Sequence, residues 1–155
     1  MAIVLGANLS QTYTSLDDGN TPTPGDLYFG TGSEVYKFVQ YKEGTAATDG
    51  VASEVAYYYT LDGYKLNQVT SDLSDSVEIG AGVLQANVSE DEYVWVQIKG
   101  PATLALALTA GADGDPLTPT GSADGTLDVS GAVTDNVCAI AGDISDKEII
   151  CDFPF

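Results

Sequence analysis

The stretch Val51-Ala-Ser-Glu-Val-Ala-Tyr-Tyr-Tyr-Thr-Leu-Asp-Gly-Tyr-Lys-Leu-Asn-Gln-Val-Thr70 gives the clearest indication of the fold. Two runs rich in β-branched and aromatic residues, 51–61 and 64–70, flank the dipeptide Asp62-Gly63. Both central positions of a tight hairpin turn need a positive φ, which this dipeptide adopts readily. The stretch therefore predicts a β-hairpin.

Further strand patterns lie on both sides of this hairpin. They cover residues 27–29, 34–42, 82–88, 93–99, 102–109, 126–133, 137–141 and 148–152. Asp-Gly turn signals recur between them, and no long apolar stripe has the helical period. The Ala-Leu run within 102–109 has a period of two, which favours a strand. Short strands with frequent turns predict an all-β fold, either an antiparallel β-sandwich or a small barrel.

The first 33 residues differ from the remainder. They have no clear periodicity, and Pro22 and Pro24 push their predecessors out of the helical region. We expect residues 1–33 to be an extended N-terminal arm and residues 34–155 to be a β-rich body. A long irregular segment of this kind either contacts something or is a disordered terminus, and the sequence leaves both open.

The chain lacks most of the side chains that enzymes use for catalysis and for binding metals. The chain has no His, no Arg, two Cys and five Lys, against 23 Asp and Glu. Serine triads and Cys–His pairs need a His, and a structural zinc site needs more Cys or His than this. We therefore expect a protein that binds without catalysis and holds no cofactor.

The formal charge of −18 narrows the range of partners. It repels phosphate backbones and anionic lipid, so we expect no nucleic-acid partner and no membrane partner. The same charge also serves as a solubility coat. The first six residues have no basic region, and their apolar run is too short for a secretion signal or a membrane span. We expect a soluble protein made in the cytoplasm.

Acidic residues are the remaining candidates for chemistry. A pair of carboxylates could serve a glycosidase, but most acids here lie in turns, where they are usually solvated. Asp113, Asp115 and the run Glu90-Asp91-Glu92 offer oxygen ligands for calcium, without the spacing of an EF-hand. We expect neither a catalytic pair nor a metal site.

The two cysteines fall on the last pair of predicted strands. Pairing Ala141 with Glu148 would place Cys138 opposite Cys151. Such thiols are either two small buried apolar residues or, after release from the cell, a disulfide. The sequence leaves both possibilities open.

Aromatic residues are the candidates for an interface, where Tyr is enriched. Three successive tyrosines, Tyr57 to Tyr59, must point to both faces of their strand. Packing at the edge of the core is the alternative for these rings. The predicted interface residues are Leu27, Tyr28, Phe29, Tyr57, Tyr58, Tyr59, Phe153 and Phe155.

One order of strand and turn motifs is more specific than composition. Residues 80–88 read GAGVLQANV, 93–100 read YVWVQIKG and 110–117 read AGADGDPL; Asp124-Gly125 and a last β pair follow. Upstream, residues 36–41 read YKFVQY. From Glu34 onward this order resembles the capsid decoration (cement) proteins of tailed bacteriophages and the structural phage proteins related to them.

The resemblance implies a protein without catalysis that binds the outside of a phage head where major capsid subunits meet. Such proteins stabilise the shell, often as trimers and sometimes as dimers or monomers. The implied partner is the major capsid protein, and the implied location is the capsid exterior, after synthesis in the bacterial cytoplasm. We expect the N-terminal arm to contact the capsid or an adjacent copy, and the segment 153–155 to fill an apolar groove of its own chain or of a neighbour.

Two other functions remain open from the sequence. A carbohydrate-binding or adhesion module on a virion surface, in a fibre or tail, would use Trp95 and the tyrosines as stacking platforms. Exposure of Trp95 in a groove favours this alternative, and full burial argues against it. A glycosidase would instead show a cleft with two facing carboxylates.

Overall fold

A computed structural model describes residues 1–16, 21–60 and 62–155 of the chain. The strands are β1 (Ile3–Val4), β2 (Leu27–Phe29), β3 (Val35–Tyr41), β4 (Val55–Tyr59), β5 (Gln68–Thr70), β6 (Ser76–Leu84), β7 (Tyr93–Thr103), β8 (Pro116–Thr118), β9 (Asp128–Val129), β10 (Ala139–Ala141) and β11 (Glu148–Asp152). Between them lie one turn of helix, α1 (Gly63–Leu66), and a 3-10 turn, η1 (Leu73–Asp75). Within the described residues, no helix is long and apolar enough to cross a membrane.

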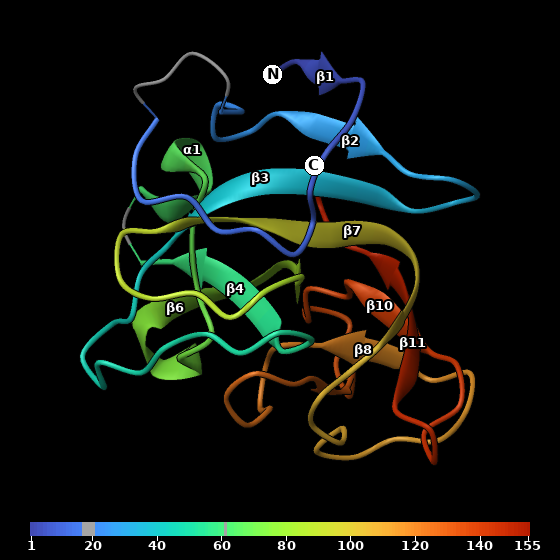
Figure 1. The fold of residues 1–155 in the computed structure, drawn as a ribbon. Helices are drawn as coiled ribbons and strands as arrows, with labels where there is room; N and C mark the ends of the chain where they lie inside the picture. The colour runs from blue at the N-terminus through green and yellow to red at the C-terminus, as the bar shows by residue number, and fades with distance from the viewer. Residues whose placement is uncertain (17–20, 61) are drawn as a thin grey trace.

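Five strands close into a small barrel (Figure 1), which confirms the all-β prediction. The order is β3-β5-β4-β6-β7, and the pairing of β7 with β3 closes the ring. The β3–β5 pair is parallel, and the other pairs of the barrel are antiparallel. Closure leaves the strands of the ring without free edges, as in other small barrels.

The long strand β7 belongs to two parts of the molecule. Its first half, residues 93–97, lies in the barrel beside β3 and β6. Its second half, residues 99–103, pairs with β11, and the sheet continues through β10 and β8 to β9. The barrel therefore carries a sheet extension built from the C-terminal third of the chain (Figure 1).

The N-terminal segment lies against the barrel. β2 forms as expected over residues 27–29 and pairs antiparallel with β3, and β1 adds to β2 in parallel. In the part of the sequence between β1 and β2, Tyr13 exchanges two main-chain hydrogen bonds with Tyr93 of β7, of 3.0 and 2.8 Å. Residues 1–33 thus contribute strands to the sheet, and their role as an arm that contacts a partner stays a prediction.

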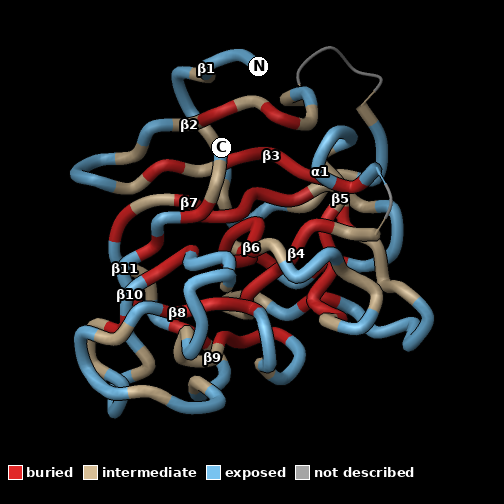
Figure 2. Tube along the Cα trace, turned by 180° about the vertical axis from the view of Figure 1, so that it is seen from behind, coloured by how far each residue is buried: buried red, intermediate tan, exposed pale blue. Residues whose placement is uncertain are grey.

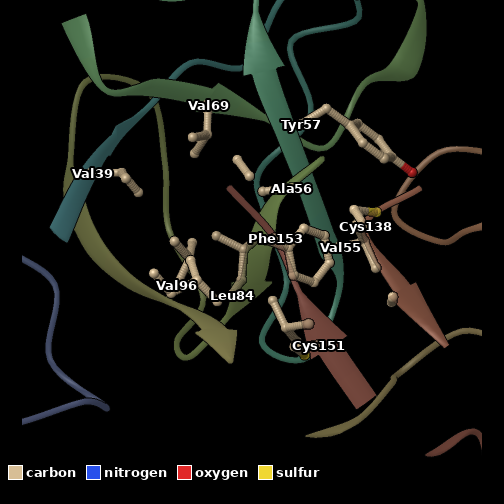
Figure 3. Close-up of a cluster of buried hydrophobic side chains, with 14 of the residues drawn as sticks. Val39, Val55, Ala56, Tyr57, Val69, Leu84, Val96, Cys138, Cys151 and Phe153 are labelled. Atoms are coloured by element: carbon tan, nitrogen blue, oxygen red, sulfur yellow. The ribbon is translucent and has the colours of Figure 1, made fainter. Parts of the chain in front are cut away.

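One apolar core runs from the barrel into the extension (Figures 2 and 3). Phe153 is fully buried and belongs to the same cluster as Val55, Leu84 and Cys151. A side chain at Gly80 would approach the Phe153 ring to 2.7 Å, so only glycine fits at this position of β6. The C-terminal segment therefore fills a groove of its own chain with Phe153.

Several predicted strands have different limits. The stretch 51–70 does form an antiparallel pair, β4 with β5, but a helical turn at Gly63–Leu66 replaces the predicted tight turn and the start of the predicted strand 64–70. The predicted strands 93–99 and 102–109 are not separate, since β7 continues through Gly100-Pro101 and ends at Thr103. The prediction of a strand over residues 104–109 is wrong. Of residues 126–133, only Asp128–Val129 is a strand.

The register of the last hairpin is shifted by one residue from the predicted one. Ala139 pairs with Cys151, and Ala141 pairs with Ile149. Cys138 therefore does not lie opposite Cys151, and both cysteines are free thiols in the core. Burial raises the pKa of the Cys151 thiol to about 12, and it also raises the pKa of Cys138.

Candidate interaction surface

The eight side chains predicted to form an interface do not lie on one surface. Four are buried: Leu27, Tyr57, Tyr58 and Phe153. Tyr28 and Tyr59 are half-buried, whereas Phe29 and Phe155 are exposed, at 50% and 47%. The four buried side chains already pack inside the chain, so in this conformation they have no surface to offer. For the exposed pair, a role at an interface stays a prediction.

Tyr57 shows why the tyrosine run is internal. Its hydroxyl accepts the Thr126 N–H at 3.0 Å and donates to the carbonyl oxygens of Thr126 and, at 3.1 Å, Ala123. Burial raises the pKa of this hydroxyl, which keeps it a neutral donor. Tyr57 therefore fixes a distant loop to β4, a role that its place in the sequence does not reveal.

A second set of aromatic rings lies where the N-terminal segment covers β3 and β7. The Phe38 ring contacts those of Tyr13, Tyr93 and Trp95, with centroids 5.6, 6.0 and 5.1 Å apart. Tyr28 meets Trp95 edge-on at 6.3 Å. Phe38 and Trp95 are fully buried, and we call these rings the covered aromatic cluster. Trp95 therefore offers no face on which a sugar could stack.

Four exposed apolar residues form a row across the sheet extension. Pro101 of β7 pairs with Ile150 of β11, Ile150 with Ile140 of β10, and Ile140 with Pro116 of β8. All four are exposed, Ile140 at 45% and Ile150 at 51%. Three spacings between strands make this apolar row about 14 Å long.

The row follows from the alternation of β11. Residues 148–152 read EIICD and are in turn exposed, buried, exposed, buried and exposed. Ile149 and Cys151 point into the core, which turns Ile150 outward. The alternation shows that one isoleucine faces outward, but only the pairing of four strands brings it beside Pro101, Ile140 and Pro116. Sequence reasoning missed the row for that reason.

Charged and polar side chains border the apolar row. On one side, Lys99 pairs with Asp152 across β7 and β11, with Nζ and Oδ1 2.5 Å apart. On the other side, the exposed Glu148 pairs with Thr103. A contiguous apolar strip with a polar border is typical of protein–protein contact sites.

The acidic side chains in the loops bind main-chain N–H groups and a lysine of the chain itself. Asp115 accepts the Ala112 N–H at 2.7 Å, and Asp113 accepts the Ile144 N–H at 3.0 Å. Glu90 and Asp91 both pair with Lys42. Across the described ranges, no three Asp, Glu or Cys side chains are grouped as a metal site requires.

Comparisons with known proteins give one distant likeness. No family model and no curated protein matches the chain. Among solved structures, the fold is similar to the N base of the head fiber protein gp8.5 of bacteriophage phi29, with 16% identity and a TM-score of 0.49. The match covers 79% of this chain and 98% of that one. A likeness this distant does not transfer a function.

Proposed function

We propose that this chain is a structural protein of a phage virion, and that it decorates and stabilises the head by binding between major capsid subunits. The proposal rests on the order of motifs, which resembles the order in cement proteins. In the structure, these motifs form much of two central strands. The segment 80–88 enters β6, and 93–100 is most of β7. Binding energy alone is the expected mode of action.

The apolar row is the observation that carries the binding role. A soluble chain of −18 charge has little reason to expose four adjacent apolar residues on a regular sheet unless another surface covers them. Pro101 and Pro116 also lack an N–H, so they add shape to the row without adding a hydrogen-bond donor. The row offers a rigid, flat contact that needs little ordering when it binds.

The alternative functions differ in what they require. A carbohydrate-binding module built on Trp95 needs an exposed indole face, and this indole is fully buried. A fibre or tail component could use the same apolar row against a different virion protein. From the resemblance to cement proteins, we expect the major capsid protein to be the partner. We expect the assembled form to be a homotrimer, with a dimer as the second possibility.

Binding to capsids that lack the protein tests this function. The purified chain is mixed with such shells, and the bound fraction is measured by co-sedimentation. We expect saturable binding, and at least a tenfold loss of affinity when Ile140 and Ile150 are both changed to Ser. The matched control changes Val51 and Val133, two exposed apolar residues outside both the row and the N-terminal arm, to Ser and should bind normally.

The outcomes separate the two parts of the proposal. If the unmodified chain does not bind the shells, capsid decoration is wrong. If the Ile140/Ile150 variant binds as tightly as the unmodified chain, decoration stands and a different surface makes the contact.

A further inference from the structure

Within the described part of the chain, Lys37 is the one lysine that is buried without a carboxylate partner. Only 4% of its surface is exposed. Lys42 and Lys99 form ion pairs, and Lys147 donates to the Ala105 carbonyl oxygen. Among the described residues, none forms an ion pair with Lys37. A buried ammonium without a counter-charge is costly, so its surroundings call for an explanation.

The Lys37 ammonium lies among aromatic groups. Its Nζ donates to the Tyr58 hydroxyl at 2.9 Å and lies 5.3 and 5.7 Å from the ring centroids of Tyr58 and Tyr64. The hydrogen bond to Tyr58 and the nearby Tyr64 ring offset part of the lost hydration. Even so, burial lowers the pKa of Lys37 to about 8, which shows that the charge is incompletely stabilised.

Lys37 lines a hollow of about 250 Å³ together with Tyr64, whose ring lies beside the ammonium. Lys65 also lines the hollow, so two of the five lysines of the chain meet at one place. The other lining residues are apolar, aromatic or amide-bearing: Met1, Pro24, Gly25, Tyr64, Asn67 and Phe155. On one side, the Tyr64 hydroxyl donates to the main-chain oxygen of Phe155 at 3.2 Å.

We propose that this hollow binds a small carboxylate that carries an apolar or aromatic group. The carboxylate would accept hydrogen bonds from Lys37, whose ammonium has three donors and gives one to Tyr58. Lys65 at the rim supplies a second positive charge, and the ring of Tyr64 supplies an apolar wall. The volume suits a molecule smaller than most drug-sized ligands.

The net charge of the chain and the lining of the hollow favour a ligand with a single negative charge. A body of −18 charge repels a dianion more strongly than a monoanion, which disfavours phosphate. The hollow also has no Arg fork and no glycine-rich loop, the usual means of holding a phosphate. A single carboxylate matches one buried ammonium.

Binding of benzoate tests the proposal directly. Titration of the full chain is followed by NMR, with benzamide as the neutral probe of the same shape and inorganic phosphate as a second anion. We expect benzoate to shift the signals of Tyr64 and Asn67 at concentrations at least tenfold below those needed for either other probe. Equal effects of benzoate and benzamide, or no effect of benzoate, would overturn the proposal.

Two lysine variants locate the site. Lys37→Met keeps the length of the side chain and removes its charge, and it should weaken benzoate binding at least tenfold. Lys42→Met removes an ion-paired lysine outside the hollow and should leave binding unchanged. Unchanged binding in the Lys37 variant would place the anion elsewhere and overturn the assignment.

A measurement on the unmodified chain does not depend on how the variants fold. The pKa of the Lys37 ammonium, followed by NMR, should rise above about 8 when benzoate is bound, because a neighbouring anion favours the charged form. The other titratable groups around it are Tyr58, Tyr64, Lys65, the amino group of Met1 and the terminal carboxylate of Phe155. A pKa that does not change would overturn the proposal.

A further arm identifies the source of the carboxylate. A dipeptide with glutamate next to phenylalanine, blocked at both ends, carries its carboxylate on a side chain. Tighter binding of this dipeptide than of benzoate indicates a glutamate borne by a protein. Tighter binding of benzoate indicates a free organic acid, and both results support the site.

Discussion

The two ends of β7 present apolar side chains in opposite environments. At the N-terminal end, Trp95 and its neighbour Phe38 are covered by Tyr13 and Tyr28, which come from the first 33 residues. At the C-terminal end, Pro101 and its row have no covering segment among the described residues and are exposed. The sequence of a strand therefore does not determine whether its apolar residues are buried. Burial depends on whether a segment from elsewhere in the chain covers them.

The difference explains which aromatic residues are available for binding. The side chains that the sequence favoured as an interface are mostly large rings, and large rings contribute most to stability when they are buried. Of these side chains, Tyr28 helps to hold the N-terminal segment on the barrel, Tyr57 fixes a distant loop, and Phe153 fills the core. The exposed apolar row consists instead of two isoleucines and two prolines, which lie side by side only when the strands are paired.

Removing a ring from the covered aromatic cluster should have the largest effect on stability. Phe38→Ala leaves a cavity among three aromatic rings, and we expect a loss of about 3–5 kcal/mol in the free energy of unfolding. Urea unfolding followed by circular dichroism measures this loss. A loss below about 1 kcal/mol would show that the N-terminal segment does not cover Phe38 in solution.

The reactivity of the thiols tests whether water reaches the buried face of the sheet extension, opposite the apolar row. With its pKa raised to about 12 by burial, Cys151 is far less ionised at pH 8 than an unfolded thiol, by about a thousandfold. Alkylation by iodoacetamide should therefore be at least that much slower in the native chain than in guanidinium chloride. Rapid native alkylation would show that the extension opens to water.

The same shift has a consequence at high pH. The folded chain keeps the Cys151 proton between pH 9 and about 12, where an unfolded chain has lost it. Stability from this group is therefore full below pH 9 and is lost as the pH rises through that window. Unfolding measured at pH 8 and pH 10.5 should show a lower free energy at the higher pH, and Cys151→Ala should reduce the difference.

A smaller effect is expected when the cover is altered instead of the core. Tyr13→Ala removes an edge contact with Phe38, which should cost about 1–2 kcal/mol and let water approach Trp95. Since the chain has a single Trp, its fluorescence maximum should shift to longer wavelength. Leu5→Ala, on the same segment but fully exposed, is the control and should leave the maximum unchanged.

The apolar row should give the smallest change in stability. Ile150→Thr keeps a β-branched side chain on an exposed sheet face, so the free energy of unfolding should change by less than about 0.5 kcal/mol. The same denaturant measurement applies. A cost above about 1 kcal/mol would show that the row is already covered by the chain itself.

Much of the framework could be predicted from the sequence. The strands at 27–29 and 148–152 begin and end where their residue patterns indicate, and β3 differs by one residue at each end. Local chemistry is sufficient for such elements, because β-branched and aromatic residues between turns need no distant partner to favour an extended chain. The scarcity of cations and the two thiols are also plain from the composition.

The closed ring, the covered aromatic cluster and the apolar row depend on tertiary structure alone. Each requires residues far apart in the chain, such as Tyr13 with Tyr93 or Pro101 with Ile150, and strand register is set by those distant pairings. A one-residue change of register changes which residues face each other, as the shifted last hairpin shows for Cys138 and Cys151. The amino-acid order therefore determined that this protein is built from short strands, and only the packing of those strands decided which apolar side chains became its core and which became its surface.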